Sequence, residues 1–287
     1  MKGLFNHFCS IQFRVALVTL LLPTIGWGQS EVTRRVSAAE MGYKGRVKMV
    51  QSTEFCTDSA HRYFVTTAEA YNEAGLRTDM STIEDVIYQT NYHYEYDDNG
   101  QLVYYLATYS EGGKDSIVFH YGKDGCLFGY EEYFLSYDPT EGNSVTDFLV
   151  TCDAQCRPLM AASVWDDTTT FVYDEQGRVV AKTAPTVYAP QVTWTYSYDE
   201  QGRLARVRTG DSHYEDTHYR YNEQGDTLEV WHTNWEHWAG DVGAHEIGKH
   251  KYYTYTAYDD HGNWTTAKVT VRKSHTYTII RTFRYYE

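Results

Sequence analysis

Apolar and polar residues alternate along several segments of this chain, and each segment runs into a turn-forming sequence. Before Asp199, apolar side chains occupy every second position, at Val192, Trp194, Tyr196 and Tyr198. The same period of two precedes Asp97 and Gly122. A period of two is typical of a β-strand with one apolar and one polar face. The pattern therefore predicts β-hairpins whose strands are roughly eight residues long.

One turn motif recurs along the chain: an aromatic residue, Asp or Asn, two variable residues, Gly, one variable residue and an aliphatic residue. Clean copies begin at Tyr96, Tyr173 and Tyr198, looser copies at Tyr71, Tyr121, Tyr221 and Tyr258, and an eighth at Cys152, where Cys156 replaces the glycine. Three of the seven intervals between copies are 25 residues. Such regular spacing indicates an array of about eight repeats.

The motif has a direct mechanical interpretation. An Asp or Asn side chain can accept a hydrogen bond from a backbone N–H two residues further on, which favours a tight turn. Glycine then follows where a type I turn closed by a G1 bulge requires positive φ. The turn glycines are expected at Gly75, Gly100, Gly125, Gly177, Gly202, Gly225 and Gly262.

These units predict an all-β protein, with tandem antiparallel hairpins forming one long, curved, open sheet over residues 65–287. Residues 29–64 form either a degenerate first repeat or an N-terminal arm. Neighbouring units depend on one another in such arrays. The apolar face of the sheet must be covered, and it can curl on itself, fold into two layers or take a partner.

The copies Tyr173–Val179 and Tyr198–Leu204 resemble the YD repeat of the RHS family. This resemblance implies hairpins that spiral into a curved sheet, which in large members closes into a shell around a cargo. It also implies a link to carbohydrate binding or cell-surface contact, which some members have. Because eight repeats are few for a closed shell, we expect the sheet to stay open and to carry no cargo.

The first 28 residues have the pattern of a secretory signal peptide. Lys2 and Arg14 precede an apolar run at 15–22, and Gly26-Trp27-Gly28 supplies small residues before an expected cleavage site at Gln29. No other segment is apolar enough to span a bilayer, so we expect no membrane span in the mature chain. The protein is expected to be periplasmic, on the outer surface or secreted.

Charge and cysteines narrow the function further. Removing Lys2 and Arg14 with the signal peptide moves the net charge from −14 to −16, which disfavours nucleic-acid binding because phosphate contacts need clustered cations. Export permits disulfides. Cys152 and Cys156 straddle one turn and could form a short disulfide, while Cys126 paired with either of them is the alternative.

The longest interval between repeats holds three of the seven tryptophans. Its candidate ligand-binding residues are Trp231, His232, Trp235, His237 and Trp238. Tryptophan faces can stack on sugar rings while the histidines supply hydrogen bonds. The other interpretation is a long loop whose tryptophans cover an open sheet end. The zinc motif H-E-x-x-H fails here, because Lys249 stands where the second histidine is required.

No catalytic arrangement, metal site or cofactor motif stands out in the sequence, so we do not expect an enzyme. The sequence favours an exported, non-enzymatic repeat protein that binds a glycan or a protein partner at the cell envelope. The alternative is a structural protein that associates with itself through exposed strand edges and has no small ligand.

Overall fold

The computed structural model describes residues 37–56, 64–84, 88–136, 142–164, 167–186, 189–210, 215–238, 241–245, 250–271 and 275–287. The expected signal peptide lies outside these residues. The described strands are β1 (Val47–Cys56), β2 (Phe64–Tyr71), β3 (Arg77–Glu84), β4 (Tyr88–Tyr96), β5 (Leu102–Tyr109), β6 (Lys114–Tyr121), β7 (Leu127–Leu135), β8 (Asn143–Cys152), β9 (Pro158–Ser163), β10 (Thr168–Tyr173), β11 (Val179–Thr186), β12 (Ala189–Tyr198), β13 (Leu204–Thr209), β14 (Glu215–Tyr221), β15 (Thr227–Trp238), β16 (Asp241–His245), β17 (Lys251–Tyr258), β18 (Trp264–Val271) and β19 (His275–Tyr285).

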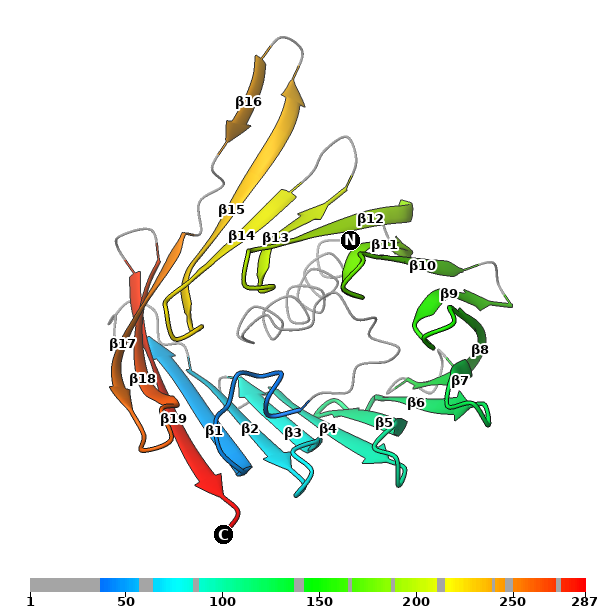
Figure 1. Ribbon diagram of the computed structural model, residues 1–287, viewed down its shortest axis with the longest axis horizontal. Coiled ribbons are helices and arrows are strands. Elements are labelled where there is room, and N and C mark those ends of the chain that lie inside the picture. The colour runs from blue at the N-terminus through cyan, green and yellow to red at the C-terminus, as the bar shows by residue number, and fades with distance from the viewer. Residues whose placement is uncertain are drawn as a thin grey trace.

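The strands form a closed antiparallel barrel (Figure 1). Apart from β16 and β17, strands that follow one another in sequence are paired, and β1 pairs with β19 over the span Val47–Cys56. Eighteen strands make up the ring, because β16 pairs only with the outer part of β15 while β17 pairs with β15 nearer the ring. The β15–β16 hairpin projects beyond the wall in Figure 1.

Closure shows that the expectation of an open sheet was wrong. The all-β class and the hairpin pattern hold, but the described ring leaves no free edge. Strand twist has a fixed hand, so hairpins added in one direction bend progressively until the ends meet. The strand that closes the ring is β1, which lies in the segment that the sequence left as an arm or a degenerate repeat.

All eight repeat turns lie at one rim of the barrel, since each repeat contributes two strands. In each turn the residue at the glycine position donates its N–H to the carbonyl of the Asp, Asn or Gly three residues earlier. The seven turn glycines have φ between 75° and 89°, as a G1 bulge requires. Cys156 takes the same conformation with φ 60°, so the eighth turn keeps its shape without glycine.

The inner face of the wall carries the apolar core. One cluster on β4–β7 includes Tyr94, Leu102, Phe119 and Leu127. The segment 37–46 lies on the inner side of β1 and β2 (Figure 1). There Tyr43 packs edge-on against Tyr71 and Phe283, with ring centroids 6.2 and 5.5 Å apart.

The outer face differs from one part of the ring to the other. On β12–β14 the residues that alternate with the core are polar: Gln191, Thr193, Thr195, Ser197, Arg206, Arg208, Asp216, His218 and Arg220. On β7–β10 the outward positions include exposed apolar side chains, namely Phe128, Val145, Leu149, Leu159 and Val172. We call these five residues the outer apolar patch. The barrel is thus apolar inside and mixed outside.

Candidate ligand-binding site

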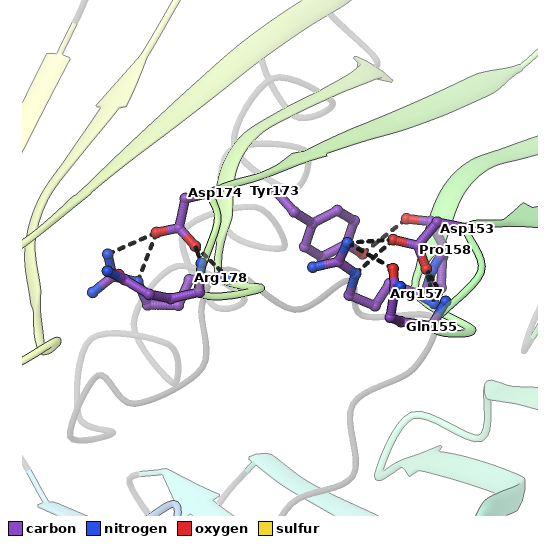
Figure 2. Close-up of polar contacts among 8 residues, drawn as sticks. Asp153, Gln155, Arg157, Pro158, Tyr173, Asp174 and Arg178 are labelled. Carbon is purple, nitrogen blue, oxygen red and sulfur yellow. Dashed lines mark hydrogen bonds and ion pairs between the residues drawn. The ribbon is translucent and has the colours of Figure 1, made fainter.

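The repeat turns are tied together by a ladder of Asp, Arg and Tyr side chains (Figure 2). Asp153 accepts backbone N–H bonds from Gln155 at 2.9 Å and Arg157 at 3.0 Å, and the Arg157 Nε donates to its other oxygen at 2.6 Å. The Arg157 guanidinium lies 4.9 Å from the ring centroid of Tyr173 in the next repeat. The Tyr173 hydroxyl donates back to the Pro158 carbonyl at 2.8 Å.

The same contacts recur one repeat later. Arg178 pairs with Asp174 and covers Tyr198 at 4.3 Å, and the Tyr198 hydroxyl donates to Val179 at 2.7 Å. Hydrogen bonds from Arg157 and the backbone hold the pKa of Asp153 below its usual range. Burial raises the pKa of Tyr173 to about 12, so its hydroxyl stays a donor. The motif tyrosine thus links each hairpin to the one before it.

Cys152 stands where the motif has tyrosine and makes the corresponding contact, its Sγ donating to the Leu127 carbonyl at 3.3 Å. It does not form the expected disulfide. Cys156 bonds to Cys126 instead, with Cα atoms 4.7 Å apart. The reason lies in the wall, because the turns of neighbouring hairpins lie side by side at the rim. The alternative that the sequence left open is therefore the one formed.

The segment 37–46 is fixed across the inner side of this rim. Ala38 N donates to the Gly75 carbonyl at 2.8 Å. At the other end Lys44 N donates to Asn263 Oδ1 at 2.7 Å, and Asn263 Nδ2 donates to the Lys44 carbonyl and to the Tyr285 hydroxyl, both at 2.8 Å. The buried Asn263 side chain thus holds the segment over the turn between β17 and β18.

A cavity of about 180 Å³ lies between this segment and the inner wall of β14, β15 and β17–β19. Aromatic rings form much of its lining, at Tyr43, Tyr219, Tyr221, Tyr253, Tyr255, Trp264 and Phe283. Polar groups enter at Arg203, Asp226, Asn263 and Arg281. An aromatic hollow with a few polar groups is the usual form of a small-molecule site.

The polar groups of the cavity differ in how they are satisfied. Arg203 donates to Asp199 at 2.7 Å within its own turn. The Asp226 carboxylate accepts from Asn222 at 3.3 Å and from the Tyr258 hydroxyl at 3.4 Å. Arg281 is 8% exposed, and its guanidinium lies 3.5 Å from the ring centroid of Trp264 and 5.5 Å from that of Tyr43.

Next to Arg281 along the inner wall lies a buried acid. Arg281 faces Ser52 in the β1–β19 ladder, and Glu54 is two residues further along β1. Burial raises the pKa of Glu54 to about 7, with Lys251 the cation that opposes the shift. Glu54 Oε2 is buried without a hydrogen-bond partner among the described residues. This cavity could not be predicted from the sequence, because its lining joins residues 41–43 to residues between 203 and 283.

The residues predicted from the Trp-rich segment do not form one site. Trp231 faces outward from β15, where it stacks on His218 at 4.9 Å and meets His250 at 5.7 Å. His232 faces inward, with its Nδ1 3.0 Å from the Thr217 hydroxyl and 3.2 Å from Glu215. A strand alternates its side chains, so adjacent residues lie on opposite faces of the wall.

The remaining residues of that prediction are placed only by their backbone. Trp235, His237 and Trp238 lie on β15 opposite Ala244, Val242 and Asp241 of β16, and their side chains lie outside the described residues. The segment is a projecting hairpin of two strands, where the sequence had suggested a loop. His218 stacks on Trp231 and His250 lies next to it at a tilt of 32°, so a sugar that stacked on Trp231 would compete with these imidazole rings.

Two searches of the described residues concern other classes of site. No group of three or more His, Cys, Asp or Glu side chains there could hold a metal ion. In the same part of the chain, no helix is long and apolar enough to cross a membrane.

Comparison with known proteins gives no family for this chain. No family model matches it. No curated protein matches it either. Among solved structures, it is similar to a porin-like protein from Bacteroides uniformis with a TM-score of 0.46 and 12% identity, over 84% of this chain and 99% of that one. The resemblance to the RHS family was therefore wrong as a recognition: no family model supports it, and the hairpins close into a barrel.

Proposed function

We propose that this chain is an exported, non-enzymatic barrel that binds a saccharide at the cell envelope, in the cavity beneath the segment 37–46. The observation that carries the proposal is the cavity lining. Aromatic faces and a small number of polar groups converge there, which is the combination that recognises the apolar face and the hydroxyl edge of a sugar ring.

Export and location are supported by the sequence of residues 1–28, which has the order of regions found in signal peptides. The absence of enzyme chemistry is part of the same proposal. The described lining of the cavity holds one carboxylate, Asp226, and no serine, cysteine or histidine. A binding role accounts for the cavity without a reaction step.

A glycan array with the mature protein from Gln29 onward tests the proposal, together with two matched variants. Trp264→Ala removes an aromatic wall of the cavity. Trp194→Ala removes another core tryptophan, one that contacts Lys182 and does not line the cavity. We expect glycan binding to be lost in the first variant and kept in the second. Equal binding by both variants, with both folded by circular dichroism, would exclude this cavity as the site.

The outer apolar patch favours a second candidate function, association with another copy of the chain. Exposed apolar patches on a folded protein commonly mark interaction sites. The described ring has no free edge, so self-association through its strand edges would require the barrel to open. The outer apolar patch is already accessible, because Leu149 is 72% exposed and Phe128 is 54% exposed. Light scattering of Leu149→Lys, with the exposed polar position Thr151→Lys as the control, tests whether the chain associates through this patch. Concentration-dependent oligomers that only Leu149→Lys abolishes would support this candidate.

We also propose that the outward face of β15 and its projecting end contact a protein partner. Variants with Ala at Trp231, Trp235 and Trp238 test that role. Unchanged glycan binding together with loss of a partner in a pull-down would assign the hairpin to protein contact. Loss of glycan binding in this triple variant, with Trp264→Ala unaffected, would move the saccharide site from the cavity to the hairpin.

A further inference from the structure

The cavity singles out a class of saccharide, and this inference rests on the function proposed above. We propose that the ligand is an acidic sugar of the uronic acid type, whose carboxylate pairs with the guanidinium of Arg281 while its ring lies against the aromatic lining.

Arg281 is built into the cavity as an anion receptor. Its side chain comes from the inner face of β19 and is more than nine-tenths buried. Trp264 and Tyr43 contribute ring faces to its guanidinium, which fixes the plane of the group. Its Nε has no hydrogen-bond partner in the described part of the chain. A buried cation in this state is costly unless an anion completes it.

A second buried arginine, Arg77, has an acidic partner, although its Nε lacks a hydrogen-bond partner just as that of Arg281 does. Arg77 is 3% exposed, and its guanidinium lies 5.0 Å from the Tyr94 ring centroid. Arg77 also has a carboxylate partner, Glu69, at 3.8 Å, and donates to the Tyr94 hydroxyl at 3.3 Å. Both arginines thus have aromatic neighbours, but only Arg77 has an acid of this chain beside it among the described residues. At Arg281 the carboxylate of the ligand would take the role that Glu69 has at Arg77.

The other charged groups around the cavity do not supply that anion. Asp226 is held by Asn222 and Tyr258, and Arg203 is neutralised by Asp199. Glu54 lies two residues beyond Ser52, the residue that faces Arg281, but burial raises its pKa to about 7, so its neutral form predominates in mildly acidic solution. Arg281 is therefore the cation of the described lining that has no acidic partner, and aromatic rings frame it.

A carboxylate suits this site better than a more highly charged anion. One guanidinium presents two parallel N–H donors that match the two oxygens of a carboxylate. Aromatic rings make up much of the remaining lining, and the carboxylate of Asp226 would repel further negative charge. The volume of about 180 Å³ accommodates a single ring rather than an extended chain.

Isothermal titration calorimetry with a matched pair of probes tests the inference. Methyl glucuronide and methyl glucoside share a pyranose ring and differ at C6, where only the first has a carboxylate. A buried charge-assisted hydrogen bond is worth about 1.5–3 kcal/mol. We therefore expect mature wild-type protein to bind the glucuronide at least ten-fold more tightly at pH 6.

Two variants locate the effect. Arg281→Gln should reduce glucuronide affinity to that of the glucoside. Arg178→Gln is the control, because the Arg178 guanidinium also lies over an aromatic ring, that of Tyr198 at 4.3 Å, but does not line the cavity. It should keep the preference.

Equal affinity of the wild type for both probes would overturn the inference while leaving saccharide binding intact. A preference that survives in folded Arg281→Gln would overturn the role of Arg281. Failure of both probes, with no binding across the glycan array, would remove the proposed function as well. If Arg281→Gln does not fold, the wild-type comparison of the two probes still decides between a site for acidic sugars and one for neutral sugars.

Discussion

The disulfide between Cys126 and Cys156 makes a quantitative prediction about stability. It joins two neighbouring repeat turns whose cysteines are 30 residues apart in sequence. In the chain-entropy model, closing a loop of that length stabilises the folded state by about 3.6 kcal/mol. Replacing both cysteines by serine should lower the free energy of unfolding by about that amount, and the melting temperature by roughly 10 °C.

The conformation of Cys156 separates two contributions within this effect. Its φ of 60° places it in the left-handed region, which costs an L-residue about 1–2 kcal/mol and costs glycine little. The variant Cys126→Ser/Cys156→Gly should therefore be about 1–2 kcal/mol more stable than Cys126→Ser/Cys156→Ser. Both variants lack the disulfide, and their sequences differ only at position 156.

Equilibrium urea unfolding, followed by tryptophan fluorescence, measures these differences. Cys56 and Cys152 remain in every variant, so their contributions cancel. A serine pair as stable as oxidised wild-type protein would refute the loop-closure reasoning. A glycine variant no more stable than the serine variant would refute the claim that Cys156 is held in an unfavourable conformation.

Three further results are expected. Tyr198→Phe removes the hydrogen bond to the Val179 carbonyl and should cost about 1 kcal/mol in urea unfolding, whereas the control Tyr104→Phe should cost almost nothing; equal losses would contradict the ladder. The folded-state pKa of Glu54 is raised to about 7, so its ionisation destabilises the fold as pH rises from about 4.5 through 7, by about 3 kcal/mol in all; Glu54→Gln should flatten melting temperature over that range, and an unchanged profile would show that Glu54 does not titrate there. Burial raises the pKa of Asp174, but the hydrogen bonds and the charge of Arg178 lower it by more, so the folded-state pKa lies below the ordinary value. The stabilisation from the ionised Asp174 is therefore present above its ordinary pKa and is lost as pH falls through the folded-state pKa. Asp174→Asn should reduce the loss of stability below pH 4 in acid unfolding, and the same loss in the variant and the wild type would argue against the ion pair.

The local structure of this protein could be predicted from its sequence because each signal is carried by neighbouring residues. The alternation before Asp199 predicted β12, and the turn from Asp199 to Arg203 connects it to β13 as expected. The positive φ of the turn glycines could be predicted, because the two residues that define each turn are only three positions apart in the sequence. Even the degenerate copy at Cys152 follows the same rule.

Contacts between distant segments were not predictable in this way. The sequence also left the cysteine pairing open. The pairing is decided by the lateral contact of two neighbouring turns, and the short separation of Cys152 and Cys156 in the sequence does not decide it. The Trp-rich segment could be recognised by its composition, but composition does not say which side chains face out, and one residue of phase separates Trp231 from His232.

The sequence by itself determined the hairpins, their turns and the apolar face of each strand, since these depend on periodicity and on preferences of single residues. Only the tertiary structure decided that the sheet closes, because closure depends on twist summed over eighteen strands and on a match between β1 and β19. The same long-range closure brings Tyr43, Trp264 and Arg281 together, so the cavity exists only once the two ends of the chain have met.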